Sequence, residues 1–428
     1  MKKIVFTFLW SITFLQFANA QKLSTNEKKI IQIIDKQLPQ ALAFNEKTVN
    51  VNSGTFNKNG VKEVGDMYKK EFDAIGFTTR WIDMPESMDR AGHLFAEVKG
   101  TKGKRILLVG HLDTVFEPDS PFRRYELHDS IATGPGTSDM KGGNMVLLFA
   151  LKALHQANLL KNTQIVVALH GDEENAGDPI SISRRDIIEA AKRSDIALAY
   201  EDATEYDYAT IARRGSSDWK LVVHGKQAHS SLIFRDEIGA GAIYETSRIL
   251  HRFYNELQEE LLTFNPGLIA GGTKVSVDST GRFGSTSGKD NIIANTVIVH
   301  GDLRFISEEQ KAAARKKMQA IVSENLPNTS AEIIFNDSYP AMSPTEGNMK
   351  LLKVYSQVSV DLGMGEVKPF DPGKRGAGDI SFVAEYVDAL DGLGVTGGGG
   401  HSLSEYMEID TVGDQIKRTA LLIYRLTR

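Results

Sequence analysis

Short apolar runs that alternate with helical segments set the strongest limit on how this chain folds. The strand-like runs lie at 93–98, 106–110, 163–170 and 196–200. Apolar residues at helical spacing predict helices near 24–43, 61–75, 145–156 and 183–193. Strands that alternate with helices are typical of a doubly wound, mostly parallel sheet. We therefore expect an α/β fold for this part of the chain.

The pattern changes after Gly215 and returns at about Asp337. Between these points the sequence predicts strands at 216–225, 273–277, 296–305 and 331–335, helices at 238–261 and 307–324, and a Ser/Gly-rich loop at 279–290. This β-α-β-β-α-β order is typical of a ferredoxin-like α+β domain. Helices are again expected at 347–362 and from Asp379 through Tyr386. We expect one α/β domain in two segments, 21–214 and 337–428, with the inserted domain at 215–336 and hinges near its ends.

The first twenty residues predict a secretory signal peptide. Lys2 and Lys3 precede an apolar run from Ile4 to about Phe14, and Ala18 and Ala20 form a small-x-small end. The run is shorter than the roughly 20 residues of a spanning helix. We expect cleavage near Ala20, a secreted or periplasmic mature protein, and no membrane span once the signal is removed.

Charge and cysteine content narrow the classes of partner and cofactor. Removal of the two signal-peptide lysines, its only charged residues, takes the formal net charge from −5 to −7, and no basic tract follows. We therefore expect no nucleic-acid partner. The chain has no cysteine, so disulfides and cysteine-linked lipids are excluded. Any bound metal must then be held by histidines and carboxylates.

Polar residues follow several of the predicted strands. The candidates are His111, Asp113, Asp139, Glu173, Glu174, Glu201 and His401. The carboxyl ends of neighbouring parallel strands meet at one edge of a sheet, so these side chains can form one site. Imidazole and carboxylate suit zinc, and a pair of cations about 3.5–4 Å apart needs a bridging carboxylate.

Each candidate also has a simpler explanation. The run Asp172-Glu173-Glu174 is compatible with a solvated loop. Asp139 is compatible with a helix cap. Asp202 stands beside Glu201 and is an alternative ligand.

The motifs of this chain resemble those of the dizinc metallopeptidase family of aminoacylase, glutamate carboxypeptidase and succinyl-diaminopimelate desuccinylase. The resemblance is carried by HLDTV at 111–115, GPGTSDMKGG at 134–143, DEE at 172–174, LAYE at 198–201 and HSLSEY at 401–406. It covers essentially the whole mature chain, is nearest to glutamate carboxypeptidase, and implies a zinc-exopeptidase fold with an inserted lid domain.

The resemblance implies specific roles. Asp139 would bridge two zinc ions, with Co²⁺ or Mn²⁺ as substitutes. His111 and Glu201 would complete one metal site, and Glu174 and His401 the other. Asp113 would orient His111 through its other ring nitrogen. Glu173 would be the general base that activates water.

Three residues of the inserted domain match substrate-contacting segments of the family. His229, in GKQAHS at 225–230, would reach into a partner subunit's active site and help to hold the oxyanion. Asn291 and Arg304 would contact the substrate, and the planar guanidinium of Arg304 suits a terminal carboxylate. The resemblance thereby implies a homodimer formed through the inserted domain.

We therefore expect an exported zinc-dependent carboxypeptidase that hydrolyses the amide before a C-terminal amino acid of a small peptide or N-acyl amino acid. The loop NAGDP at 175–179 differs from glutamate carboxypeptidases, and Arg213-Arg214-Gly215 resembles the desuccinylase branch. A dipeptidase or N-acyl amino acid acylase with the same metals stays open. A non-catalytic protein that binds small carboxylates is the alternative of another class, which an intact Glu173 disfavours.

Overall fold

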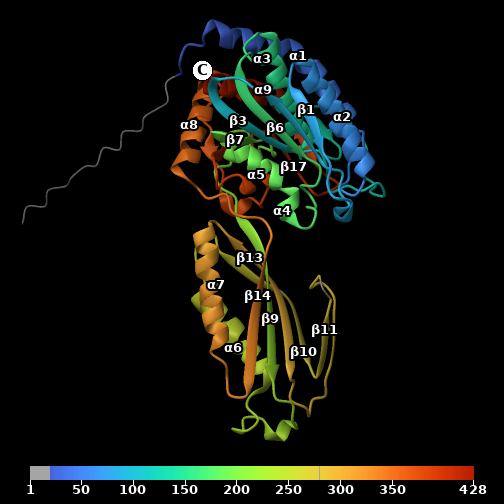
Figure 1. Cartoon of the computed structure of the whole chain (residues 1–428), viewed down its shortest axis with the longest axis vertical. Helices are drawn as coiled ribbons and strands as arrows, with labels where there is room; N and C mark the ends of the chain where they lie inside the picture. Colours follow the sequence, from blue (N-terminus) through green and yellow to red (C-terminus); the bar gives the residue numbers. More distant parts are fainter. Residues whose placement is uncertain (1–19, 279) are drawn as a thin grey trace, which may run out of the picture.

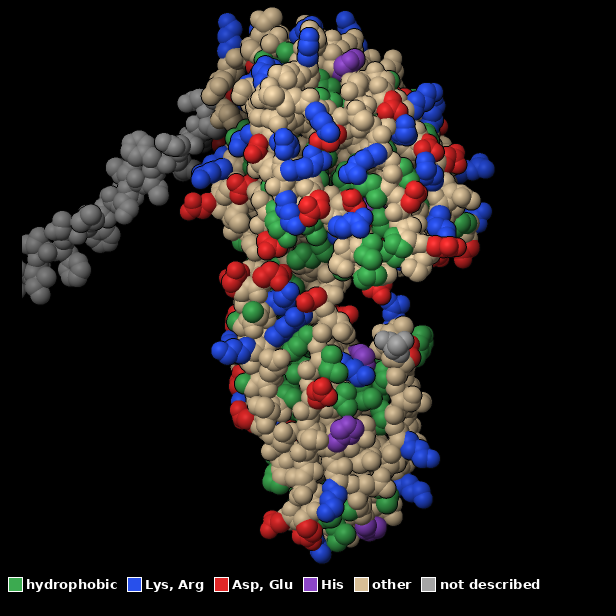
Figure 2. Space-filling view, viewed as in Figure 1, with side chains coloured by type: hydrophobic (Ala, Val, Ile, Leu, Met, Phe, Trp, Pro, Cys, Tyr) green, Lys and Arg blue, Asp and Glu red, His purple; other side chains and the backbone are tan. Residues whose placement is uncertain are grey.

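Two main sheets organise the chain in the computed structural model, which describes residues 20–278 and 280–428. Each sheet lies in its own lobe, and the larger lobe meets the smaller one at a narrow waist (Figures 1 and 2). The expected signal peptide falls outside the described residues, apart from Ala20. Within the described part of the chain, every helix is too short or too polar to cross a membrane.

A six-stranded sheet forms the centre of the larger lobe. Its strands, in spatial order, are β1 (Thr78–Ile82), β2 (His93–Val98), β6 (Thr163–His170), β3 (Lys102–His111), β7 (Ile196–Ala199) and β16 (Asp388–Leu390). The last four run parallel to one another, whereas β1 and β2 are antiparallel to their neighbours. The expected mostly parallel sheet is confirmed.

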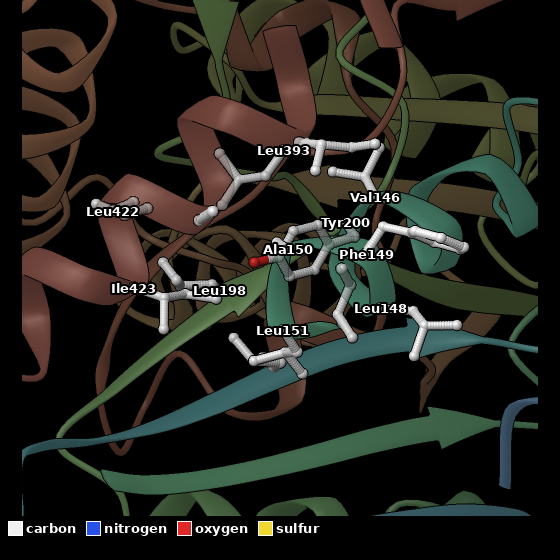
Figure 3. Close-up of a cluster of buried hydrophobic side chains, with 14 of the residues drawn as sticks. Val146, Leu148, Phe149, Ala150, Leu151, Leu198, Tyr200, Leu393, Leu422 and Ile423 are labelled. Carbon is white, nitrogen blue, oxygen red and sulfur yellow. The ribbon is translucent and has the colours of Figure 1, made fainter. Parts of the chain in front are cut away.

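Helices cover both faces of this sheet, so its inner strands are apolar on both sides. One face packs against α1 (Thr25–Val49), α2 (Lys58–Ala74), α3 (Lys141–Gln156), α8 (Glu346–Asp361) and α9 (Ile409–Leu426), and the other against α5 (Arg185–Lys192) and the 3-10 helix η4 (Asp379–Phe382). Along β3, Ile106 and Leu108 join the first core and Leu107 joins the second. Figure 3 shows Leu148 and Leu151 of α3 in the apolar cluster that also contains Leu198 of β7.

A four-stranded antiparallel sheet with two helices forms the smaller lobe. Its elements are β9 (Gly215–Gly225), α6 (Gly241–Glu256), β10 (Thr263–Gly272), β13 (Thr296–Phe305), α7 (Glu308–Ser323) and β14 (Thr329–Asp337). The spatial order is β10-β13-β9-β14. A separate apolar core around Trp219 and Phe253 joins the helices to the sheet. This is the ferredoxin-like arrangement that the sequence predicts.

The second strand of this sheet was predicted in the wrong place. The strand expected at 273–277 is β11 (Lys274–Val277), which pairs with β12 (Gly284–Ser287) in a separate hairpin. The sheet strand is β10, which contains Pro266 and an irregular register between Pro266 and Leu268. Proline and a bulge interrupt the alternation by which a strand is recognised, and they are tolerated at a sheet edge. The predicted loop at 279–290 correspondingly contains β12.

The remaining elements are short, and several of them hold loops in place. They are η1 (Glu86–Met88), β4 (Glu126–His128), β5 (Ile131–Thr133), α4 (Ile180–Ser183), β8 (Tyr208–Ala209), η2 (Ser230–Leu232), β15 (Lys368–Pro369), η3 (Pro372–Lys374), β17 (Gly397–Gly398) and β18 (Tyr406–Glu408). Strands β17, β18, β5 and β4 form a small sheet that flanks His401. The helix expected from Asp379 through Tyr386 is wrong: η4 ends at Phe382, and turns lead into β16.

The chain passes between the lobes twice, and the two passages pair with each other. Arg213 and Met342 exchange backbone N–H···O bonds of 2.9 and 3.0 Å, and Ser216 donates its N–H to Tyr339 O at 2.8 Å. The junction is thus a short two-stranded ribbon that includes the predicted hinge positions. The domain boundaries at 214/215 and 336/337 stay predictions.

The first prediction concerns the core beneath α3. Leu148 is fully buried, and replacing it with alanine leaves a cavity that neighbouring side chains fill only in part. We expect Leu148→Ala to lower the free energy of unfolding by about 2–5 kcal/mol in urea denaturation. The matched control is Leu127→Ala, since Leu127 is 56% exposed on β4. Equal losses in the two variants would contradict the packing described.

Candidate dinuclear metal site

The carboxyl edge of the parallel strands brings the strand-end candidates together. His111 is the last residue of β3, Glu173 and Glu174 follow β6 by three and four residues, and Glu201 follows β7 by two. Neighbouring strands in register place these positions side by side, as they do His111 and His170. Such an edge is where open α/β sheets form their ligand sites.

Two groups of potential metal ligands share Asp139. In the first group, His111 Nε2 lies 3.1 Å from Asp139 Oδ1 and 3.7 Å from Glu201 Oε1. In the second, His401 Nε2 lies 3.3 Å from Asp139 Oδ2 and 3.0 Å from Glu174 Oε2. The ligand atoms within each group all lie within 4.8 Å of one another. Each carboxylate oxygen of Asp139 therefore faces a different imidazole, as a bridging ligand requires.

The electrostatics of the site favour bound cations. Burial, followed by the charge of Asp139, raises the pKa of Glu174 to about 7 and that of Glu201 to about 8. Hydrogen bonds to Asp139 and Glu174 raise the pKa of His401 to about 11. Without metal, the site thus retains protons that divalent cations would displace. Two imidazoles and three carboxylates fit a pair of zinc-like ions.

Glu201 and its neighbour Asp202 have different environments. Glu201 belongs to the first group. Asp202 Oδ1 lies 2.7 Å from Arg375 Nη1, and its backbone carbonyl accepts a bond from the same guanidinium. The structure therefore places Glu201, and not Asp202, in the ligand group.

Asp113 holds the loop after β6. Its Oδ1 accepts the N–H of Glu173 at 3.0 Å, and its Oδ2 accepts the N–H of Glu174 at 3.1 Å. Thr55 Oγ1 donates to Oδ2 at 2.7 Å. His111 Nδ1 lies 3.0 Å from the backbone oxygen of Asp113 and 3.5 Å from Oδ1. Asp113 thus contacts His111 chiefly through its backbone, while its carboxylate fixes the two glutamates.

Glu173 belongs to neither group, but its carboxyl interacts electrostatically with His111 and Glu201 of the first group and with Glu174 of the second. Burial raises the pKa of its carboxyl well above the ordinary value, and the charges of Asp379, Glu201 and Glu174 add to this effect. Its backbone oxygen accepts a hydrogen bond of 2.9 Å from Tyr339 Oη. A carboxyl with a raised pKa beside a metal site suits a group that takes and returns a proton.

The three candidates in the smaller lobe do not join this cluster within one chain. His229 follows the far end of β9, and the N–H of Ser230 bonds to Asn291 O at 2.9 Å. Arg304 lies on β13 opposite Ser216, the second residue of β9, near the junction. Its Nε lies 2.9 Å from both carboxylate oxygens of Asp302. Since β9 runs from the junction to the far end of the lobe (Figure 1), Arg304 is separated from the other two.

Glu405 is a functional candidate whose role the sequence did not reveal. Its buried carboxylate accepts the N–H groups of Gly136, Ser138 and Asp139 at 3.1, 2.8 and 2.9 Å. Burial raises its pKa to about 7, although these hydrogen bonds act in the opposite direction. Glu405 joins the loop that carries Asp139 to the segment that carries His401. Its only sequence signal was its place in the motif at 401–406.

A buried ion-pair network beneath Glu173 was also missed. Arg184 Nη1 lies 2.6 Å from Asp172 Oδ1, and Arg184 Nε lies 2.7 Å from Asp379 Oδ1. His170 Nδ1 lies 2.5 Å from Asp379 Oδ2. His93, His170 and Asp172 form a third group with possible ligand atoms. Because Arg184 already forms an ion pair with Asp172, we assign this group a structural role and not a role in metal binding.

The second prediction tests Glu405. In Glu405→Gln, one carboxylate oxygen becomes an NH₂ group, which cannot accept the N–H bonds of the Asp139 loop. We expect the affinity for zinc to fall about 10–100-fold, measured by competition with a chromophoric chelator. Glu408→Gln, on the adjacent strand β18, is the control and should bind zinc as the unmodified protein does. Unchanged affinity in Glu405→Gln would contradict the role described.

Known proteins resemble this chain in sequence and in fold. Carboxypeptidase G2 from Pseudomonas sp. (strain RS-16) is 28% identical over 425 residues, covering 96% of this chain and 94% of that protein. Succinyl-diaminopimelate desuccinylase from Rickettsia bellii is 24% identical, covering 84% and 90%. The solved structure of YXEP from Bacillus subtilis, described as a dinuclear metal-binding peptidase, superposes with a TM-score of 0.63 at 13% identity, covering 92% and 99%.

The family assignment rests on a match over most of the chain. Residues 107–425, which contain all five members of the two groups that share Asp139, match "Peptidase family M20/M25/M40". Proteins of this family are metal-dependent hydrolases that act on peptides. The chain belongs to peptidase family M20/M25/M40.

Proposed function

We propose that this protein is an exported dizinc carboxypeptidase that hydrolyses the amide bond before a C-terminal amino acid, in the manner of glutamate carboxypeptidases. The observation that carries the proposal is Asp139, which faces two separate histidine–carboxylate groups. The buried carboxyl of Glu173 interacts electrostatically with His111 and Glu201 of one group and with Glu174 of the other. The name of the relative carboxypeptidase G2 supports the reaction. Export rests on the predicted signal peptide and implies a secreted or periplasmic enzyme.

The ligand groups suggest how the chain would hold two metals. His111, Glu201 and one oxygen of Asp139 would bind one ion, and Glu174, His401 and the other oxygen would bind the second. When bound, two zinc ions would supply Lewis acidity that polarises the amide carbonyl and activates the attacking water. Zinc suits this mixed set of imidazole and carboxylate donors, with Co²⁺ or Mn²⁺ as substitutes.

Glu173 would transfer a proton from the attacking water to the leaving nitrogen. Its carboxylate accepts a proton from the attacking water, and the resulting acid returns it to the leaving nitrogen. Bound cations would lower the pKa that burial raises, so that Glu173 begins the cycle ionised. The bond from Tyr339 and the N–H of Glu173 itself, donated to Asp113, hold this residue in place.

Three residues of the smaller lobe suggest the class of substrate. A guanidinium such as that of Arg304 pairs in bidentate fashion with a free carboxylate, and Asn291 offers an amide to the substrate backbone. His229 would stabilise the developing oxyanion. These roles suit a small peptide or an N-acyl amino acid with a free carboxylate.

These roles also require a second subunit, since His229 and Asn291 lie at the far end of the smaller lobe. Within the described residues, β10 is an edge strand of its sheet. Ile269 on β10 and Ile243 and Tyr254 on α6 are 61%, 52% and 65% exposed. Although the β11–β12 hairpin lies against part of β10, an edge strand beside exposed apolar residues suits a two-fold interface. We propose a homodimer in which each smaller lobe completes the partner's site.

A dipeptidase or N-acyl amino acid acylase would use the same residues, and the preferred substrate distinguishes these activities. The third prediction therefore uses a panel of N-acyl amino acids and dipeptides, supplied to chelator-treated protein with and without zinc. We expect zinc-dependent release of the C-terminal residue. In Glu173→Gln, turnover should fall at least about 100-fold, because general base catalysis is lost while the site keeps its shape.

Metal content and a matched variant complete this test. Glu173→Gln should retain two zinc ions per chain by elemental analysis. Glu189→Gln, which changes a glutamate on the surface of α5, should retain full activity. Full activity in Glu173→Gln would refute the assigned base, and a zinc-loaded protein that turns over no substrate would favour the carboxylate-binding alternative.

The fourth prediction tests the shared active site. His229→Ala and Glu173→Gln should each be inactive alone. When the two are co-expressed, half of the dimers are mixed, and each mixed dimer has one site with both residues intact. We expect recovery to about a quarter of the wild-type activity. Co-expression of His229→Ala with the double variant is the control, and it should stay inactive. Absence of recovery in the mixed sample would contradict a site shared between subunits.

A further inference from the structure

The junction ribbon carries one side chain into the larger lobe. Tyr339 belongs to the second passage between the lobes, where its backbone oxygen accepts the N–H of Ser216 at 2.8 Å. Ser216 is the second residue of β9, the central strand that runs through the smaller lobe. Because of this pairing, a change in the orientation of the smaller lobe moves the backbone of Tyr339.

The side chain of Tyr339 ends at the catalytic loop. Its Oη donates to the backbone oxygen of Glu173 at 2.9 Å and accepts from Arg184 Nη2 at 3.2 Å. Its ring packs edge-on against Phe382, with ring centroids 4.9 Å apart. The hydroxyl of Tyr339 therefore both donates and accepts a hydrogen bond. The packing of the ring against Phe382 restricts the movement of this hydroxyl.

A buried ion-pair network in the larger lobe holds the base of the loop to which Tyr339 bonds. Arg184 is fully buried, and it binds the carboxylates of Asp172 and Asp379 as well as the backbone oxygen of Asp172. Asp172 and Asp379 are themselves buried. The base of the loop at Asp172 is therefore anchored in the larger lobe, while Glu173, the next residue, is held by Asp113 on one side and Tyr339 on the other.

We propose that Tyr339 is a positioning residue that couples the orientation of the smaller lobe to the placement of Glu173. The hydroxyl holds Glu173 through its backbone when the ribbon has the geometry described here. A rotation of the lobe withdraws the hydroxyl and releases Glu173 from one of its two holds. Turnover is thereby linked to the lobe position that also places substrate-binding residues. This inference rests on the proposed role of Glu173 as the base.

The test removes only the hydroxyl. Tyr339→Phe keeps the ring against Phe382 and loses both hydrogen bonds. We expect kcat to fall about tenfold, as the loss of one well-placed hydrogen bond allows, while KM changes less than about twofold. Zinc content should stay at two ions per chain. The control is Tyr206→Phe, which removes a hydroxyl that bonds to Asp414 at 2.8 Å on α9, and it should leave kcat unchanged.

A second readout follows the lobes directly and needs no substrate. The chain has no cysteine, so Lys70→Cys on α2 and Lys316→Cys on α7, both exposed, allow spin labels to be attached to one site in each lobe. The distance between the labels is measured by pulsed electron spin resonance in zinc-loaded protein. We expect a broader distance distribution with Tyr339→Phe than with the tyrosine, and no broadening with Tyr206→Phe.

The outcomes separate this inference from the proposed function. A lower kcat with nearly constant KM, together with a broadened distance distribution, would support the coupling. Wild-type kcat, an unchanged distribution, or a fall in zinc content that accounts for the lost activity would overturn it. If the unmodified protein hydrolyses no substrate of the panel, the proposed function fails, and an unbroadened distribution would then overturn the coupling independently.

Discussion

The crowding of carboxylates at one edge of the sheet is the constraint on which the rest of the structure depends. Five carboxylates, those of Asp113, Asp139, Glu173, Glu174 and Glu201, gather around the imidazoles of His111 and His401. Burying like charges is costly unless they are protonated, hydrogen-bonded or neutralised by cations. The raised pKa values of Glu174 and Glu201 reflect that cost.

Hydrogen bonds from backbone N–H groups stabilise two buried carboxylates and fix the positions of the loops that carry the candidate ligands. Asp113 accepts two of them from the loop after β6, and Glu405 accepts three from the loop before α3. Each carboxylate thus ties a ligand-bearing loop to a distant part of the chain. The remaining negative charge is of the kind that a pair of divalent cations neutralises. Structural order and metal binding are therefore expected to reinforce each other.

Much of the site was predictable because it follows from strand periodicity. The apolar run at 106–110 predicts β3, and the edge rule for parallel strands then predicts that His111, Glu174 and Glu201 meet. Strand β10 escaped prediction because Pro266 and the bulge beside it break the alternation on which strand recognition depends. Glu405 escaped because its partners are backbone N–H groups, which leave no pattern in the side-chain sequence.

The sequence by itself determined the alternation of strands and helices in the first segment of the larger lobe, the mixed class of the fold, the histidine–carboxylate donor set and the family, because periodicity and motifs are local properties of the chain. Only the tertiary structure decided that Asp139 faces two separate imidazoles, that Asp202 pairs with Arg375, and that Tyr339 reaches Glu173 across the junction. These contacts join residues far apart in the chain. They depend on how the loops and lobes pack, which residue spacing does not encode.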